Sequence, residues 1–447
     1  MPVREHLWDS DTDARPWDET QRMALTAVGD LIARLHASDG GWSDRLRGVR
    51  PDSVLRLSDL NEIPFTTKED LRSAQTEIIE GQPLGAFQAA PIEDISLITS
   101  SSGTTGAPVY FGVTAHDRAR WANAVANAYW TAGVRPSSVV ALTTGMPMVA
   151  GGLPYAEGIQ RAGGALAWMG AQPMSRMADA MQRLKVSVLV GTASFSAFFA
   201  QRCEEELGIP ATELNVRTVI GGGEPGLGIE EIRDRVAHAW AATRVSEIMG
   251  LGDVLPAMWA ECRVGRGMHF TAGNDVLVEL IDPDTLEHVL WTPGARGEAV
   301  YTTLTRQASP VVRFRSRDHM EVTSIECPCG RTSPTVRCVG RTDDMLIYKA
   351  MNVFPSAIRD VALHVGGDRL SGIMRVRKEH ANQVRFDKPI PVEIEVVGHA
   401  DSDGVTALME HVAEAIRQQL RVRVQLEAVP AGSIPVGEYK NALTYVP

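Results

Sequence analysis

The sequence predicts an α/β protein with a large N-terminal domain and a small α+β domain at the C-terminus. One observation is a series of short apolar runs that alternate with helical patterns, for example residues 139–144 and then residues 175–184. Strands that alternate with helices favour a mostly parallel sheet covered by helices on both faces. The other observation is the length of 447 residues, which exceeds what one hydrophobic core usually supports. We therefore expect two or three domains.

The composition is that of an ordinary globular protein, with 22% charged and 44% hydrophobic residues. The formal net charge of -11 argues against a nucleic-acid partner, which would need clustered Lys and Arg. No apolar stretch approaches the roughly 18 residues needed to cross a bilayer. Residues 1–13 carry acidic side chains and lack the apolar run of a signal peptide. We expect a cytoplasmic protein without a membrane partner.

The first long element is expected to be an amphipathic helix over residues 19–36. Met23, Val28, Leu31 and Leu35 are the candidates for its buried side.

A capped helix entry is predicted at Lys68, because Thr66 and Thr67 precede Lys68, Glu69 and Asp70. This segment could serve only to dock the chain, or Lys68 could take part in chemistry. Docking is the simpler interpretation, and the sequence leaves both open.

A polar loop over residues 99–109 follows a short apolar strand and precedes a helix that starts after Thr114. Trp121, Val125 and Tyr129 share one face of that helix. The loop is rich in hydroxyls and glycines, which can wrap a polyphosphate closely. It lacks the lysine of the common phosphate-binding loop, since Ala107 stands at that position. A polar surface turn is the alternative.

Four further strands are predicted at residues 139–144, 186–190, 216–220 and 245–249, with helices such as 175–184 and 229–242 between them. In parallel sheets, ligands bind beyond the carboxyl ends of the strands. The loops at residues 221–225 and 250–253 are therefore the places to expect a site.

The pattern changes in the last part of the chain. Residues 276–281 and 298–304 resemble antiparallel strands joined through turn residues. Beyond a candidate boundary at residues 340–344, the strand and helix patterns are those of a separate α+β domain. Its predicted strands are residues 372–376, 392–397 and 422–428, and its predicted helix is residues 404–420.

Five motifs then occur in the order used by acyl-adenylate-forming enzymes, at residues 99–109, 223–225, 314–318, 340–345 and 352–355. Ile-Pro-Phe-Thr-Thr-Lys at 63–68 and Cys-Pro-Cys-Gly-Arg at 327–331 resemble the phenylacetate-CoA ligase branch in particular. The resemblance implies a large adenylation domain over residues 1–340, which includes a small barrel-like part. It also implies a small mobile domain over residues 341–447 that rotates about a hinge at Asp343.

The same resemblance implies a reaction and its cofactors. A carboxylate attacks the α-phosphorus of ATP to give an acyl-AMP, and CoA then displaces AMP. Phosphoryl transfer of this kind relies on positioning and on charge neutralisation. By similarity to the family, the nucleotide would be held by Ser101, Ser102, Gly103, Thr104, Thr105, Gly106, Gly222, Gly223, Glu224, Pro225, Met249, Gly250, Asp253, Asp318 and Arg341.

Individual roles follow from this resemblance. Asp318 would accept hydrogen bonds from the ribose hydroxyls, and Asp253 would help to hold Mg²⁺ through a water. Lys440 would contact the α-phosphate and the substrate carboxylate during adenylation. Met249 and Asp253 depart from the usual aromatic residue and Glu of the family, as Ala107 departs from the usual Lys.

The cysteines suggest a metal site. There are five, and three of them lie between Cys327 and Cys338, which fits a local site better than a disulfide framework. Cys262, His269, Cys327 and Cys329 offer three thiols and an imidazole for a tetrahedral structural Zn²⁺. Free buried cysteines are the alternative.

The acyl substrate is expected to be a small carboxylic acid. By similarity, Met146, Met148, Tyr155, Gly250 and Met258 would line its pocket, which suits an aromatic acid. These side chains could equally belong to the core.

Three functions remain open from the sequence. The first is an aryl- or arylacetate-CoA ligase. The second is an adenylating enzyme that passes the acyl group to a carrier-protein thiol or to an amine. The third, of a different class, is a catalytically degenerate nucleotide-binding protein. The sequence also leaves open whether the chain forms a homodimer.

Overall fold

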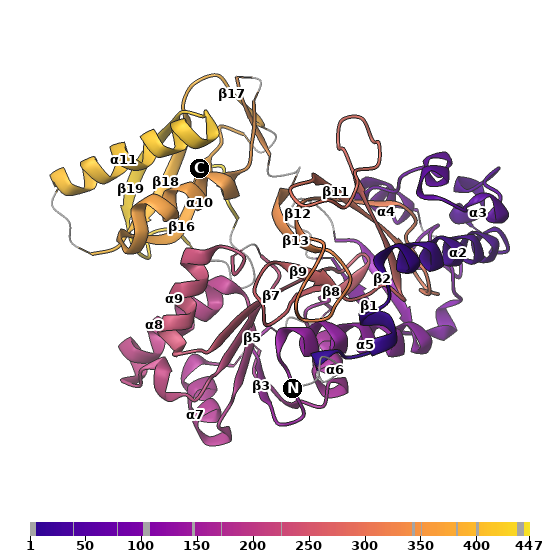
Figure 1. The fold of residues 1–447 in the computed structure, drawn as a ribbon, viewed down its shortest axis with the longest axis horizontal. Coiled ribbons are helices and arrows are strands. Elements are labelled where there is room, and N and C mark those ends of the chain that lie inside the picture. Colours follow the sequence, from indigo (N-terminus) through magenta and orange to yellow (C-terminus); the bar gives the residue numbers. More distant parts are fainter. Residues whose placement is uncertain are drawn as a thin grey trace.

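The protein is described by a computed structural model that covers residues 6–38, 40–77, 79–101, 108–144, 148–170, 172–224, 226–341, 345–349, 351–380, 383–398, 402–435 and 442–447. A large unit holds the central sheet, and a smaller C-terminal unit lies against one side of it (Figure 1).

The central sheet has eleven strands in the order β10-β11-β12-β13-β9-β8-β7-β6-β5-β3-β4. Its parallel half consists of β3 (Val139–Leu142), β4 (Ala165–Trp168), β5 (Val188–Gly191), β6 (Thr218–Gly221) and β7 (Arg244–Leu251). Its antiparallel half consists of β8 (Leu255–Glu261), β9 (Met268–Phe270), β10 (Val276–Ile281), β11 (Arg296–Thr303), β12 (Phe314–Ser324) and β13 (Thr335–Arg341). The four parallel strands predicted from the sequence are confirmed as β3, β5, β6 and β7, and the predicted antiparallel pair as β10 and β11.

The antiparallel half takes the place of the barrel-like part expected from the family resemblance. Across the parts of the chain that the structure describes, its strands belong to one open sheet and do not close into a barrel.

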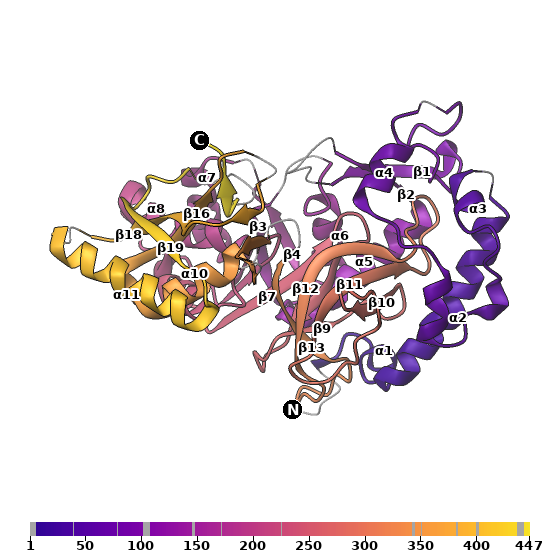
Figure 2. The same cartoon turned by 90° about the horizontal axis from the view of Figure 1, so that it is seen from above.

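Helices cover both faces of the parallel half (Figure 2). Alternate residues of each strand point to opposite faces. Val140 and Val188 accordingly pack in the core cluster that contains α5 and α6, while Ala141 and Leu189 pack in the cluster that contains α7, α8 and α9. The helices of the large unit are α1 (Ser10–Asp13), α2 (Trp17–His36), α3 (Gly41–Arg45), α4 (Lys68–Ala74), α5 (Ala115–Ala132), α6 (Leu153–Arg161), α7 (Met174–Leu184), α8 (Ala193–Leu207) and α9 (Glu230–Trp240). Short 3-10 turns are found at Pro51–Ser53, Leu57–Glu62, Ile92–Asp94 and Ala211–Glu213.

Helix α2 confirms the first predicted helix, with one correction to its buried face. Val28, Leu31 and Leu35 are buried, but Met23 is 50% exposed. Met23 lies five residues before Val28, so at 3.6 residues per turn it points away from the stripe that begins at Ala24.

Two predicted helix starts are confirmed by their caps. Thr67 caps α4 and Thr114 caps α5, and each forms a capping box with the Asp three residues later. These caps fix where the chain turns into each helix. Between them, β1 (Ile95–Ser100) and β2 (Tyr110–Thr114) form an antiparallel pair that carries the polar loop at its end.

The C-terminal unit has its own core, formed by buried residues between Leu346 and Val422. Helices α10 (Pro355–Gly366) and α11 (Ser402–Leu420) pack with two small sheets. One sheet has the order β15-β14-β17, with β14 (Leu346–Tyr348), β15 (Met351–Val353) and β17 (Arg385–Phe386). The other has the order β19-β18-β16-β20, with β16 (Leu370–Arg377), β18 (Ile390–Val396), β19 (Val424–Pro430) and β20 (Thr444–Tyr445), and a 3-10 turn at Gly367–Arg369 precedes β16.

The C-terminal unit rests on helix α9 of the large unit. An Arg235 Nη2 donates to the Gly367 carbonyl at 2.5 Å, and His364 Nδ1 lies 2.8 Å from Glu231 Oε1. The side chain of Ile232 packs against the core of the C-terminal unit. No helix among the described residues is long and apolar enough to cross a membrane.

Candidate adenylation site and cysteine cluster

Lys68 stands at the first position of α4, two residues after Thr66, whose backbone pairs with the strand that leads to Asp318. Thr66 N donates to Arg313 O at 3.0 Å, and Arg315 N donates to Thr66 O at 2.9 Å. The α4 helix is held further by an ion pair of 2.9 Å between Glu69 and Arg317. The contacts that dock this segment against the sheet therefore also hold Lys68 in its position.

The Lys68 ammonium contacts the Asp253 carboxylate, and both side chains are largely buried. Burial lowers the pKa of Lys68, while the charge of Asp253 opposes that shift. The positive charges of Arg72 and Arg341 lower it further, which places Lys68 within a cluster of cations. Lys68 thus brings a charge to the site although the polar loop itself contains no lysine.

Asp253 lies in the hairpin between β7 and β8, and glycines shape this turn. A Cβ on Gly250 would lie 2.0 Å from the Pro256 carbonyl oxygen, at the bulge where the register of the two strands shifts. Gly252 packs against Ser100 and Ser101 at the end of β1. Small residues at both positions let the hairpin approach the polar loop, while Met249 packs against the large core.

Ser101 opens the polar loop and ties its two ends together. Ser101 N donates to Val109 O at 2.9 Å, and Val109 N donates to Ser101 Oγ at 3.1 Å. The remaining loop residues that we predict to bind phosphate, Ser102, Gly103, Thr104, Thr105 and Gly106, lie outside the described residues, as does Ala107.

The segment after β6 approaches the β7 backbone closely. Gly222 N donates to Gly191 O at 3.0 Å, and a Cβ on Gly222 would lie 2.8 Å from Ile248 O. Gly223 has a φ of +84°, a conformation that favours glycine. The Glu224 carboxylate accepts a hydrogen bond of 2.7 Å from Ser194 N at the start of α8, so its side chain fixes this segment. Pro225 lies outside the described residues.

Asp318 and Arg341 face each other on the neighbouring strands β12 and β13. Arg341 Nη1 donates to Asp318 Oδ1 at 2.6 Å, and Asp318 is only 3% exposed. A buried carboxylate held by an arginine in this way is pre-oriented to accept hydrogen bonds.

Arg306 is a residue of the site that sequence reasoning missed. Its Nη1 donates to the Asp253 carbonyl at 2.7 Å, and its guanidinium carbon lies 4.9 Å from the centroid of the Trp121 ring. Among the described residues, its Nε and Nη2 have no hydrogen-bond partner, although the residue is 3% exposed. In the sequence, Arg306 is a single arginine three residues after the apolar strand β11. This position alone does not distinguish Arg306 from a surface arginine.

The predicted substrate-pocket residues are placed in different surroundings. Met148 is 48% exposed, and its carbonyl accepts a hydrogen bond from Ser100 N. Tyr155 is buried on α6 and donates to Pro256 O at 3.2 Å. Met258 is fully buried in the large core, as the core alternative expects. Met146 lies outside the described residues.

Lys440 and Asp343 also lie outside the described residues. The structure therefore brings together Lys68, Asp253, Ser101, Asp318 and Arg341 from segments that are far apart in the sequence. Lys68 and Asp253 lie just beyond the carboxyl end of β7, where the parallel half of the sheet predicts a ligand site, and Asp318 and Arg341 lie on the antiparallel strands β12 and β13.

A second cluster brings Cys262, His269, Cys327 and Cys329 together, with all ligand atoms within 4.8 Å of one another. The Cys262 and Cys327 sulfurs are 3.7 Å apart, and Cys329 Sγ is 3.4 Å from His269 Nε2. At a Zn–S distance of about 2.3 Å, tetrahedral geometry separates two sulfurs by about 3.8 Å. The four side chains therefore fit a tetrahedral zinc.

The surroundings of the cluster suit metal ligands. Hydrogen bonds from Cys262 and Cys327 lower the pKa of Cys329, which favours the thiolate that a metal requires. His269 Nδ1 lies 3.1 Å from the Ser333 carbonyl, a contact that would orient Nε2 toward the sulfurs.

Sequence comparison finds known enzymes that cover most of the chain. A phenylacetate-coenzyme A ligase of Thermus thermophilus is 30% identical over 403 residues, which cover 88% of this chain and 87% of that protein. A phenylacetate-coenzyme A ligase of Escherichia coli is 29% identical over 401 residues, 88% of this chain and 86% of that protein. No family model matches the chain.

Solved structures show the same fold. A 2-hydroxyisobutyryl-CoA ligase in the postadenylation state, in complex with R3-HIB-AMP, is 23% identical, with a TM-score of 0.88 over 100% of this chain and 94% of that chain. The ligase in the thioesterification state, in complex with 2-HIB-AMP and CoA, is 24% identical, with a TM-score of 0.71 over 100% of this chain and 93% of that chain.

Proposed function

The chain belongs to the phenylacetate-CoA ligase family, and from that premise we propose that it activates an aromatic carboxylic acid with ATP and transfers the acyl group to CoA. The observation that carries the proposal is that the Lys68–Asp253 pair beyond the carboxyl end of β7 lies within electrostatic reach of the Arg341–Asp318 pair on β12 and β13. Two cationic side chains and two carboxylates in this region suit a nucleotide and its metal.

The reaction has two steps. A carboxylate oxygen of the acid attacks the α-phosphorus of ATP, the bond to the β-phosphate breaks, and pyrophosphate leaves. The CoA sulfur, having lost its proton, then attacks the acyl carbon, and AMP leaves with the electron pair of the acyl–oxygen bond. In both steps the protein mainly positions charged groups and offsets the charge of the phosphates.

We assign the phosphates to the loop Ser101–Gly106 and to Lys68. The loop supplies hydroxyls and backbone amides, and Lys68 supplies the cation that the loop lacks. When Mg²⁺ is bound it would offset phosphate charge, and Asp253 is its candidate ligand. Because Lys68 contacts that carboxylate, the Asp253 carboxylate would have to bind the Lys68 ammonium and the hydrated Mg²⁺ at the same time.

We assign the adenosine to two neighbouring surfaces. The flat backbone of residues 222–225 and the side chain of Met249 would cover adenine, with Gly250 leaving the space open. Asp318 would accept from the ribose hydroxyls while Arg341 holds its carboxylate in place. The substrate acid would lie near Met148, Tyr155 and Gly250, with Met146 beside them, while Met258 would support this wall from within the core.

The domain assignment is residues 1–340 and residues 341–447, with Asp343 as the hinge. The separate core of the C-terminal unit supports this division. Lys440 would reach the α-phosphate and the substrate carboxylate from the small domain in the first step.

We also propose that Cys262, His269, Cys327 and Cys329 hold a structural Zn²⁺. The metal would join the segment after β8, strand β9 and the loop between β12 and β13. Free thiols of this kind persist in a reducing compartment, which supports a cytoplasmic location.

Pyrophosphate release tests the function across a panel of benzoic, phenylacetic and aliphatic acids, each with and without CoA. We expect release that depends on an aromatic acid, and a CoA thioester when CoA is present. Release without any thioester would favour transfer to a carrier-protein thiol or an amine. No acid-dependent release would favour a degenerate nucleotide-binding protein.

A further inference from the structure

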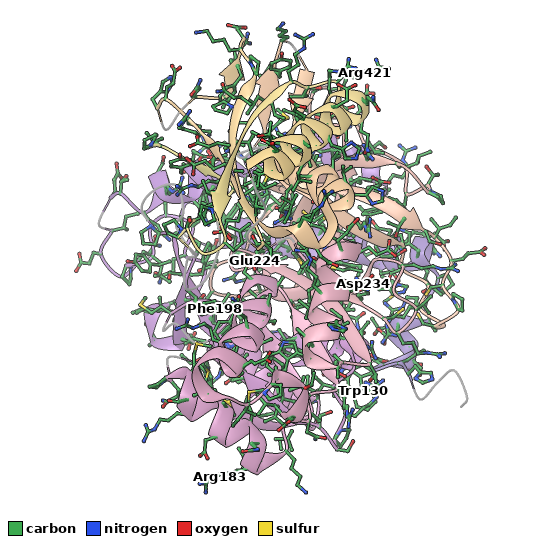
Figure 3. The ribbon with its side chains drawn as sticks, turned by 90° about the vertical axis from the view of Figure 1, so that its left-hand side faces the viewer. Trp130, Arg183, Phe198, Glu224, Asp234 and Arg421 are labelled. Atoms are coloured by element: carbon green, nitrogen blue, oxygen red, sulfur yellow. The ribbon has the colours of Figure 1, made fainter. Side chains whose placement is uncertain are left out.

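A cavity of about 220 Å³ lies at the end of the sheet opposite the adenylation site. It is lined by the first residue of β7, the turn after α5, the start of the loop after β8, and the loop that follows Cys327. β7 runs from Arg244 at the cavity to Leu251 at the adenylation site, roughly 23 Å at 3.3 Å per residue. In Figure 3, Trp130, whose ring contacts the cavity-lining Arg135, lies low on the large unit and away from the C-terminal unit.

Four arginines line the cavity, namely Arg135, Arg244, Arg263 and Arg331. Backbone carbonyls hold three of them, and one of these contacts is a hydrogen bond of 3.1 Å from Arg331 Nη2 to His6 O. Arg135 Nη1 donates to Trp130 O at 2.6 Å and Val134 O at 2.7 Å, and its guanidinium carbon lies 4.2 Å from the Trp130 ring centroid. Arg244 Nη2 donates to Thr131 O at 2.6 Å. The guanidinium groups are thus fixed in place without losing their charge.

Few carboxylates face these cations. Asp13 lies 3.5 Å from Arg331, and Glu261 is already bound by Arg233 at 2.7 Å. A zinc with three thiolates would add a single net negative charge, which leaves the four guanidinium groups in excess. Burial, and then the charge of Arg135, lower the pKa of Arg244 to about 10, so Arg244 remains protonated at neutral pH.

Arg331 carries the second observation. Its side chain is 2% exposed, and its Nε has no hydrogen-bond partner among the described residues. A buried donor without a partner costs free energy, so the wall of the cavity keeps Arg331 in place although one of its donors is unsatisfied within the described part of the chain. The cavity is much larger than a single water needs.

We propose that this cavity is a binding site for a small phosphate-bearing anion, separate from the adenylation site. Guanidinium groups donate two parallel hydrogen bonds to phosphate oxygens, which makes arginine the favoured side chain for such ligands. Arg135 and Arg244 donate to carbonyls at the C-terminal end of α5, so helix capping explains why these two arginines are present. It does not explain Arg263 and Arg331, which form no hydrogen bond with the α5 carbonyls among the described residues.

Isothermal titration with inorganic phosphate tests the proposal. The titration uses the full-length protein with its metal, chloride to hold ionic strength constant, and a saturating non-hydrolysable ATP analogue. The titration is repeated without the analogue, so that phosphate binding at the cavity can be judged even if the protein does not bind ATP. We expect phosphate to bind in both experiments.

The variant Arg263→Glu should raise the phosphate dissociation constant at least tenfold, because a charge-assisted contact is replaced by repulsion. Arg263 is exposed, so its replacement should leave the fold intact. Arg263→Ala should weaken binding in the same direction. The matched control is Arg266→Ala, an exposed arginine of the same loop that does not line the cavity. Elemental analysis and circular dichroism verify the metal and the fold of each variant.

Two results would overturn the proposal. One is the absence of phosphate binding up to tens of millimolar in the wild type. The other is the same dissociation constant in Arg263→Glu, Arg263→Ala and Arg266→Ala.

Discussion

The contact between Lys68 and Asp253 gives the proposed adenylation site a lysine that the polar loop at residues 99–109 does not contain. The motif around Asp253 predicted that this residue belongs to the site. For Lys68, the sequence left open whether the residue only docks the chain or takes part in chemistry. Those roles could not be separated because the partner of Lys68 is 185 residues away in the chain. Arg306 escaped prediction for the same reason, since its function depends on a carbonyl that only the folded chain brings near.

Replacing Lys68 by Met should slow acyl-AMP formation by about a hundredfold, the usual effect of removing one preorganised electrostatic contact from a transition state. Acid-dependent pyrophosphate release measures this step. Transfer from supplied acyl-AMP to CoA should change far less, because pyrophosphate has already left. Lys185→Met, which alters an exposed lysine of the large unit, is the control. Wild-type rates of pyrophosphate release in Lys68→Met would restrict Lys68 to docking.

Replacing Arg306 by Met should separate stability from activity. Burial lowers the pKa of Arg306 to about 10. The folded state therefore holds this proton less tightly than the unfolded state, which costs stability at neutral pH. That cost shrinks as the pH rises through about 10.

For Arg306→Met we expect a free energy of unfolding within about 1 kcal/mol of the wild type, or above it, because an apolar side chain often replaces a buried charge without loss. Acyl-AMP formation should fall at least tenfold as the Asp253 hairpin loses its anchor. Urea unfolding and pyrophosphate release measure the two effects. A large loss of stability with a normal rate per folded molecule would contradict this role.

At the level of elements, the local signals in the sequence were the reliable ones. Thr67 and Thr114 marked helix starts because a cap needs only residues within one turn. The pairing of β12 with β13, which sets Asp318 against Arg341, depends on register across separate strands and was not predicted. The cysteine cluster is an intermediate case, since the sequence supplied the ligands but only the sheet brings β9 beside the end of β8.

Removing the metal should loosen the segments that the cysteine cluster joins. We expect Cys329→Ser to lose stoichiometric zinc and at least about 2 kcal/mol of stability, because structural zinc contributes directly to folding. Elemental analysis and thermal unfolding measure the two losses. Cys203→Ser is the matched control, as Cys203 is buried far from the metal group in a different core cluster. Gently purified wild-type protein without zinc would rule out the site.

At the scale of the whole molecule, the sequence predicted the division into two units but not how they meet. The predicted boundary at residue 340 lies shortly before the first core residue of the C-terminal unit, Leu346. The contacts between α9 and the C-terminal unit involve surface residues such as Arg235 and His364, which carry no periodic pattern. The two units have separate cores, whereas their docking depends on a few side chains of α9 and its surroundings, which include the apolar Ile232.

The docking surface on α9 combines the polar contacts of Arg235 and Glu231 with the apolar side chain of Ile232. In the function that we propose, the C-terminal unit acts in the first step and rotates about Asp343 before the second.

Lys440→Ala tests this division of labour, because Lys440 would act only while the small domain is placed for adenylation. Acyl-AMP formation should fall by a hundredfold or more as a cation is lost from the transition state. The transfer of the acyl group from supplied acyl-AMP to CoA should stay near the wild-type rate, since the lysine would have moved away with its domain. Lys388→Ala, an exposed lysine of the same unit, should leave both steps unchanged. If Lys440→Ala lowered the rates of acyl-AMP formation and of acyl transfer equally, Lys440 would support the fold of the small domain and would have no role specific to adenylation.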